Sequence, residues 1–291
     1  MKISSFTLTR LAGIPVKIHW TFGFLLLFIG YYALDHHLPA DDAFWFFSYV
    51  MILFFFVVLH EMGHALTARR FGVRTKDVII SPIGGVARLE RMPENPRHEL
   101  LISLAGPFVN VILAAFFGIG LWLFADRMLP VDTRINFIEN PQDYIAYLFL
   151  INLALVGFNM IPAFPMDGGR VLRSLLTMIT GDRMKATLIA SVSGQVLAVG
   201  FISFGLYLRE YSMLVFIGLF VFLAARSEYR QLMWEKAKMD SFRDTGRLPY
   251  QTIHSSLPVG PLSQSALQTA GRCKKTEQIS GVSPDRESEE E

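Results

Sequence analysis

The stretch FWFFSYVMILFFFVVLHEMGHAL, residues 44–66, joins a long uncharged run to the most informative motif of the chain. Phe44–Leu59 carries no charge, and His60-Glu61-Met62-Gly63-His64 follows it directly. On a helix, this HExxH pattern puts its two histidines on one face, where they can bind zinc, and the glutamate between them can act as a general base on water. Polar and ionisable residues inside a membrane are costly and are usually functional. The stretch therefore predicts a zinc hydrolase that works within a bilayer.

The composition excludes an ordinary soluble domain. The 291 residues have a mean hydropathy of +0.38, and 18% of them are charged, against about 25% in globular proteins. A net charge of +2, with its basic residues beside apolar segments, argues against direct nucleic-acid binding. The single cysteine, Cys273, allows neither an internal disulfide nor a multi-thiolate zinc site, so histidine and carboxylate ligands are expected.

The apolar segments predict an all-α polytopic membrane protein with six transmembrane helices. No A-x-A cleavage site follows the first apolar run, so we interpret that run as a retained helix rather than a signal peptide. Basic residues gather on alternate connections, which predicts an inner or plasma membrane protein with both termini in the cytoplasm. The six predicted spans are Ile18–Leu34, Phe44–Leu66, Leu100–Ala125, Tyr144–Ile161, Ala186–Leu208 and Tyr211–Ala225.

A small membrane-associated β-hairpin is expected after the second predicted span. Val78–Ile80 and Val86–Leu89 are interpreted as two short strands on either side of Ser81-Pro82-Ile83-Gly84-Gly85. A simple turn made by Pro and Gly is the alternative. The chain turns polar from Asp240, so we divide it into a membrane-embedded domain, residues 1–230, and a polar cytoplasmic tail, residues 231–291, expected to be disordered.

A third zinc ligand must come from elsewhere, because catalytic zinc usually has three protein ligands. Between Tyr144 and Gly181 the only carboxylate is Asp167, which we predict to be this ligand. The alternative is that Asp167 only caps the helix after it. Glutamates soon after the HExxH motif are the rival ligands: Glu90, Glu94 and Glu99.

Asn159 is the remaining polar candidate near Asp167. Its amide could donate a hydrogen bond to the oxyanion of a peptide carbonyl. The alternative is an interhelical hydrogen bond, which is common for Asn in membranes, and we assign Asn110 and Asn152 to this packing class.

These motifs resemble the site-2 protease family of intramembrane zinc metalloproteases, in particular its compact prokaryotic branch. The HExxH motif and the stretch Asn159–Arg170, NMIPAFPMDGGR, carry the resemblance, which runs from about Gly13 to Arg230. Pro82–Gly85 and Ala105–Asn110 support it.

The resemblance implies one zinc ion per chain, held by His60, His64 and Asp167, with Glu61 activating water and Asn159 helping to hold the scissile carbonyl. It places Gly84 and Gly85 where substrate adds as an extended strand. The substrate it implies is a membrane-tethered protein cut in or near its transmembrane segment, such as a transcription regulator or an anti-sigma factor.

Two other classes of function fit part of the sequence. A metal-binding membrane transporter could use the same three ligands, but it has no need of Glu61 as a base. A non-proteolytic scaffold would be expected to have lost a ligand or this glutamate, and neither is missing.

Overall fold

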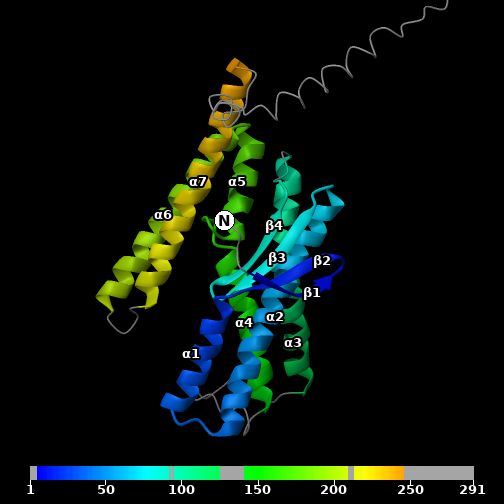
Figure 1. The fold of residues 1–291 in the computed structure, drawn as a ribbon, viewed down its shortest axis with the longest axis vertical. Coiled ribbons are helices and arrows are strands. Elements are labelled where there is room, and N and C mark those ends of the chain that lie inside the picture. The colour runs from blue at the N-terminus through cyan, green and yellow to red at the C-terminus, as the bar shows by residue number, and fades with distance from the viewer. Residues whose placement is uncertain (1–4, 92, 94, 125–140, 209–212, 246–291) are drawn as a thin grey trace, which may run out of the picture. The chain divides into compact units, whose positions relative to one another are not determined.

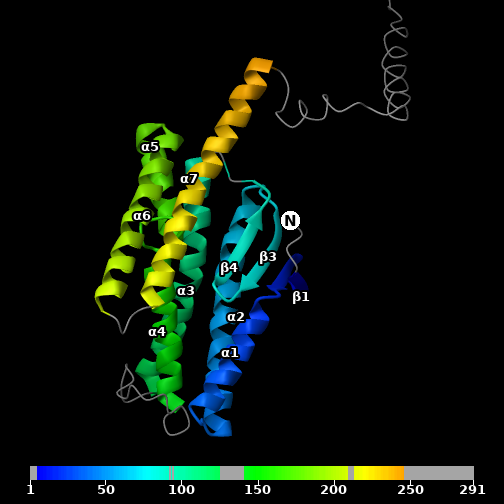
Figure 2. The same ribbon diagram turned by 60° about the vertical axis from the view of Figure 1, so that its left-hand side comes forward.

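The computed structural model describes residues 5–91, 93, 95–124, 141–208 and 213–245, and divides into two units, residues 1–232 and 233–291. Figures 1 and 2 show the described elements. The strands are β1 (Ser5–Leu11), β2 (Ile14–His19), β3 (Thr75–Ser81) and β4 (Gly84–Leu89). The helices are α1 (Phe22–Asp35), α2 (Ala40–Arg70), α3 (Pro96–Phe124), α4 (Pro141–Asn159), α5 (Asp167–Thr180), α6 (Arg183–Tyr207) and α7 (Met213–Thr245).

The four strands form one sheet in the order β1-β2-β3-β4. β1–β2 and β3–β4 are antiparallel pairs, and the predicted hairpin is the second of them. β2 and β3 are parallel, with Val16 opposite Val78, because the chain passes through α1 and α2 between them. The purely helical prediction for the N-terminal part was wrong: Ile18 lies in β2, and the helix begins at Phe22.

One face of the sheet packs against α2, the helix that carries the HExxH motif. Val16, Val78 and Ile80 share a buried apolar cluster with Met62 and Ala65 of α2. Met62 lies inside the motif itself, and burial of its side chain against the sheet turns His60 and His64 toward α3 and α5. The sheet therefore sets the rotation of the metal-binding helix.

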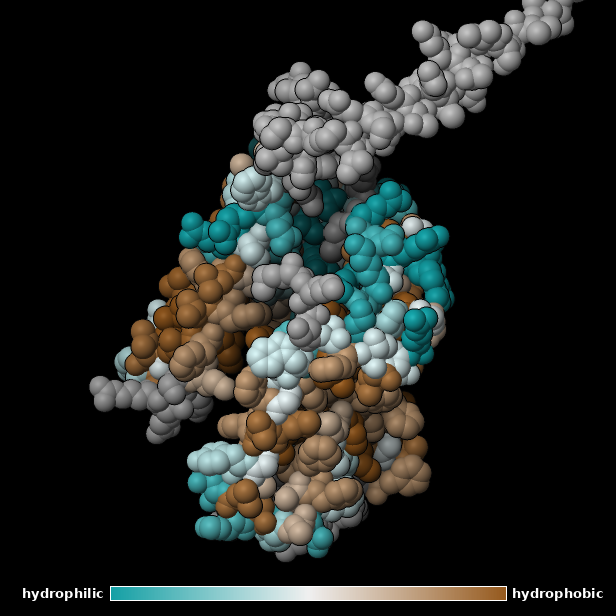
Figure 3. Space-filling model, viewed as in Figure 1, coloured by the Kyte–Doolittle hydropathy of each residue, from teal (hydrophilic) through white to brown (hydrophobic). Residues whose placement is uncertain are grey.

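Three of the described helices are long and apolar enough to cross a membrane: α2, α3 and α6. The shorter apolar helices are α1 and the Asp143–Asn159 part of α4, and the sixth predicted span falls in the first part of α7. Three of the six predicted spans are thus clear, and the count of six is not confirmed. Apolar side chains cover much of the surface over α1–α4, and hydrophilic ones gather where α2 ends and α3 begins (Figure 3).

The segment between α4 and α5 is anchored on α6 and α7. Phe164 is fully buried against Ala190 of α6 and Ala225 of α7. Its backbone N–H donates to the Ala190 carbonyl over 3.2 Å, and the Ser191 hydroxyl donates to the Ala225 carbonyl over 2.7 Å. These contacts hold the chain just before Asp167.

α7 extends past residue 231, where the sequence predicts the polar tail to begin, and ends at Thr245. Residues 246–291 lie outside the described part of the chain, so the division into a membrane domain and a tail stays a prediction.

Candidate metal centre

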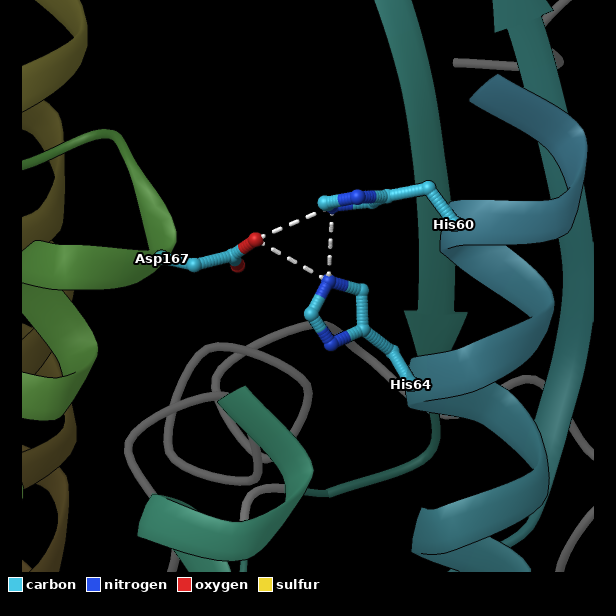
Figure 4. Close-up of side chains that lie close together, drawn as sticks. All are labelled: His60, His64 and Asp167. Atoms are coloured by element: carbon cyan, nitrogen blue, oxygen red, sulfur yellow. Dashed lines mark hydrogen bonds and ion pairs between the residues drawn. The ribbon is translucent and has the colours of Figure 1, made fainter. Parts of the chain in front are cut away.

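His60 and His64 of α2 meet Asp167 of α5 in one buried cluster (Figure 4). Asp167 Oδ2 lies 3.0 Å from His60 Nε2 and 3.1 Å from His64 Nε2, and the two Nε2 atoms are 3.1 Å apart. At most 9% of any of the three residues is exposed. The sequence prediction that a carboxylate more than one hundred residues away joins the histidine pair is therefore matched by the geometry.

Both imidazole rings are oriented by acceptors on α3. His60 Nδ1 lies 2.6 Å from the Asn110 side-chain oxygen, and His64 Nδ1 lies 2.7 Å from the Ile102 carbonyl. Each acceptor requires a proton on Nδ1, which leaves Nε2 with its lone pair toward Asp167. This is the tautomer that a metal ligand needs.

Asn110 does more than the packing role that the sequence suggests for it. Its amide group donates to the Asn152 side-chain oxygen over 2.9 Å, and Asn152 in turn donates to the Leu148 carbonyl over 2.8 Å. Both asparagines are fully buried. A polar chain therefore runs from His60 through α3 to α4. The sequence signal for this polar chain is the pair of asparagines in apolar helices. The spacing of residues does not reveal that Asn110 contacts His60.

Asp167 is the first residue of α5, and the alternative that it caps this helix is wrong. The N-cap is Met166, and no side chain makes the cap hydrogen bond. The carboxylate instead points toward the two histidines, as Figure 4 shows. Its location in the first turn places a negative charge at the positive end of the helix dipole, which is favourable.

The two rival glutamates that the structure describes, Glu90 and Glu99, do not join the cluster. Glu99, in the first turn of α3, is buried and paired with Arg173 of α5, and its second oxygen lies 3.4 Å from Arg183. Glu90 is exposed, and Glu94 lies outside the described residues. The Glu99 pair ties α3, which orients the histidines, to α5, which supplies Asp167.

Glu61 lies at the edge of the sheet. Its carboxylate accepts a hydrogen bond from the backbone N–H of Ala87 in β4 over 2.7 Å. The close approach depends on Gly85, because a Cβ there would lie 2.7 Å from Glu61 Cγ and 2.9 Å from Val57 Cγ1. Gly84 lies at the turn with φ +136° and has no such neighbour. Of the two glycines predicted to contact substrate, only Gly85 lines the cavity of the metal cluster.

Gly106 allows α3 to approach the histidines. A Cβ at this position would lie 2.2 Å from His64 Nε2 and 2.6 Å from His60 Nε2. Any side chain here would therefore occupy the space between the ligand atoms. The sequence pattern around Ala105–Asn110 marks this segment but does not reveal this reason.

The cluster opens into a small cavity of about 150 Å³. Asn159 lines it, but its side-chain amide donates to the Leu155 carbonyl over 2.9 Å, one turn back on α4. An amide has a second hydrogen, so Asn159 keeps one donor for the cavity. The lining residues are His60, Glu61, His64, Gly85, Val86, Ala87, Leu89, Asn159, Pro165, Asp167 and Arg170.

The donor set fits zinc. Two imidazole nitrogens and one carboxylate oxygen are a common catalytic zinc set, with the fourth position left for water or substrate. Ligand atoms bound at about 2.0–2.2 Å in a tetrahedron are roughly 3.3–3.5 Å apart. The separations of 3.0–3.1 Å are within a few tenths of an ångström of these values.

Comparisons with known proteins agree with this geometry. A family model described as peptidase family M50 matches residues 48–126 and 134–202. The zinc metalloprotease MJ0392 of Methanocaldococcus jannaschii is 38% identical over 227 residues, 78% of this chain and 61% of the relative. The putative zinc metalloprotease Rip3 of Mycobacterium tuberculosis is 32% identical over 76% of this chain and 58% of the relative.

A solved structure is also similar. The site-2 protease from Methanocaldococcus jannaschii matches with a TM-score of 0.57 and 36% identity, over 77% of this chain and 95% of that chain. The present chain spans about six-tenths of the length of the two curated relatives above. His60, His64 and Asp167 are its zinc ligands, and it is a multi-pass membrane protein. On this similarity of sequence, fold and ligand set, the chain belongs to peptidase family M50.

Proposed function

We propose that this chain is an intramembrane zinc metalloprotease that hydrolyses a peptide bond in or near the transmembrane segment of a membrane-tethered protein. One observation carries the proposal: the three zinc ligands and the general-base candidate Glu61 line the same buried cavity. α2, which supplies three of these four side chains, is long and apolar enough to cross a membrane. Ionisable side chains on such a helix are rare and usually functional.

The reaction follows from where the side chains lie. Zinc held by the three ligands supplies a Lewis acid that polarises a carbonyl and makes water a stronger nucleophile near neutral pH. Glu61 takes a proton from the attacking water as the water oxygen bonds to the carbonyl carbon, and the π electron pair moves to the carbonyl oxygen. Glu61 then passes this proton to the amide nitrogen. The C=O double bond re-forms, the C–N bond breaks, and the amine leaves. Asn159 is proposed to help hold the carbonyl with its second amide hydrogen.

The substrate is proposed to bind as an extended strand beside β4. β4 is the last strand of the sheet, and Gly85, Val86 and Ala87 line the cavity from that strand. A free sheet edge offers backbone groups to an extended peptide. Gly84 and Gly85 would then keep this edge clear of side chains. The substrate class is a membrane-tethered regulator, such as a transcription factor precursor or an anti-sigma factor.

The finer topology is also a proposal. Six spans would place both termini in the cytoplasm of a cell with an inner or plasma membrane, with residues 231–291 as a cytoplasmic tail. The support is the distribution of basic residues and the lengths of the described helices.

The test compares wild type with Glu61→Gln in cleavage of a single-span reporter, with zinc per chain measured in both. Glu61 accepts a hydrogen bond from Ala87 and is not one of the three zinc ligands, so the variant should keep about one zinc ion per chain. Its cleavage rate should fall by roughly 10²-fold or more.

The same pair of proteins separates the alternative functions. A metal transporter would keep metal transport in Glu61→Gln and cleave nothing in either form. A scaffold would bind partners equally in both forms, again without cleavage. Equal cleavage by wild type and Glu61→Gln would contradict the proposed role of Glu61.

A further inference from the structure

Arg170 places a guanidinium in the metal cavity without a hydrogen-bond acceptor from the described residues. It lies on α5 one turn after Asp167, and it lines the same cavity of about 150 Å³ as Glu61. Its Nε atom is buried and makes no hydrogen bond. In the described part of the chain, no hydrogen bond or ion pair of its side chain is found.

The neighbouring arginines behave differently. Arg173 donates to Glu99 and lies 4.9 Å from the centre of the Phe164 ring, and Arg183 also contacts Glu99. The Glu99 carboxylate is thus used by these two, whereas Arg170 lines the cavity. Asp167 is near enough to attract the charge of Arg170, but no hydrogen bond joins the two side chains. A buried donor without an acceptor is unfavourable, so the arrangement is explained if a bound molecule supplies the acceptor.

The chemistry of the cavity identifies that acceptor. In the proposed reaction the bound molecule is a peptide, whose carbonyl is attacked beside the metal ligands and Glu61 that line the same space. This carbonyl is neutral when it enters and gains negative charge only as water attacks it. A fixed cation in a water-poor site stabilises such charge most at that moment. Asn159 is the other donor candidate, but one of its amide hydrogens is already given to Leu155.

We infer that Arg170 is a catalytic residue that donates hydrogen bonds to the scissile carbonyl oxygen and stabilises the negative charge formed on it. The inference rests on the proposed protease function.

The cleavage experiment compares Arg170→Gln and Arg170→Lys with wild type and with Arg70→Gln, an arginine at the end of α2 outside this cavity. Arg170→Gln should lower kcat by about 10²–10³-fold, and Arg170→Lys should recover part of it. Substrate affinity is measured in two cleavage-deficient proteins, Glu61→Gln and the double variant Glu61→Gln/Arg170→Gln. The two Kd values should agree within about threefold. Zinc content and Tm should be unchanged.

A loss of zinc, or a loss of affinity as large as the loss of kcat/KM, would overturn the inference. The first result would make Arg170 a positioning residue for Asp167, and the second would make it a ground-state binding group. Unchanged kcat in Arg170→Gln would overturn it as well.

A second measurement does not depend on cleavage. The protein is loaded with Co²⁺, and acetohydroxamate, a small anionic oxygen ligand, is titrated while the visible spectrum is followed. Arg170→Gln should raise the Kd of this probe by about tenfold, which is roughly 1.4 kcal/mol, while Arg70→Gln leaves it unchanged. Equal Kd values in wild type and Arg170→Gln would refute the role of Arg170 even if no protein substrate is ever cleaved, and failure of cleavage alone would count only against the proposed protease.

Discussion

Asn110 links the metal ligand His60 to a second buried asparagine, Asn152. Asn110→Leu would remove the acceptor of the His60 Nδ1 proton and leave the Asn152 oxygen unpaired in an apolar interior. Loss of such an outer partner of a metal ligand typically weakens metal binding by about 10–100-fold. We expect this loss in zinc affinity, measured by competition with a chelator.

Two further variants separate orientation of the ring from general packing. Asn110→Asp keeps an acceptor for His60, so its zinc affinity should stay closer to wild type. Asn152→Leu removes only the hydrogen bond from Asn110 to Asn152, so it should lower zinc affinity less than Asn110→Leu does. The proposed role of Asn110 is wrong if Asn110→Leu binds zinc as tightly as wild type.

At the scale of elements, Asp77 connects three strands of the sheet. Its buried carboxylate accepts hydrogen bonds from Lys17 of β2 over 2.6 Å and from Arg88 of β4 over 2.5 Å. The hydrogen bonds from Arg88, followed by the one from Lys17, hold the pKa of Asp77 below its usual value. These bonds matter for the site because β4 carries the N–H that binds Glu61.

The pH dependence of stability follows from this lowered pKa. A group with a lower pKa in the folded state stabilises the protein above its unfolded pKa, about 3.9, and the contribution disappears as pH falls toward the folded value. At pH 7, Asp77→Asn should therefore destabilise the protein by about 1–3 kcal/mol. Thermal unfolding should show a Tm gap between wild type and Asp77→Asn at pH 7 that narrows below about pH 4. A gap that stays constant with pH would show that the charge of Asp77 is not its source.

For the whole molecule, the single cysteine allows a direct test of the proposed orientation. Cys273 lies in the tail that we place in the cytoplasm. A membrane-impermeant maleimide should label it in inside-out vesicles and leave it unlabelled in intact cells. In a Cys273→Ser background, Asp41→Cys, at an exposed position in the first turn of α2, should show the opposite pattern. Labelling of Cys273 in intact cells would overturn the proposed topology.

Much of the metal centre could be predicted because its signals are local or rare. The spacing of His60 and His64 follows from helix geometry alone. Asp167 could be found at long range because carboxylates are scarce in an apolar chain, so few candidates competed. Of the six predicted spans, the three that are clear in the structure could be predicted for a similar reason, since about twenty apolar residues in a row have few other uses.

The N-terminal strands could not be predicted in the same way. β2 is short and continues into the apolar residues of α1, so its composition resembles the start of a helix. It forms a strand because it pairs with β3, which lies about sixty residues later in the chain. Strand pairing of this kind depends on which segments the helices bring together, and no local pattern records it.

The sequence by itself therefore determined the ligands, the general-base candidate and the membrane class, because helical spacing and the cost of charge in an apolar segment restrict them. Only the tertiary structure decided what surrounds these groups. Asn110 accepts the hydrogen bond of His60, and the Ala87 N–H donates to Glu61. Arg170 lines the cavity without a hydrogen-bond acceptor among the described residues. Each of these depends on how helices and strands distant in sequence pack together. The identity of a buried polar group's partner is a property of that packing.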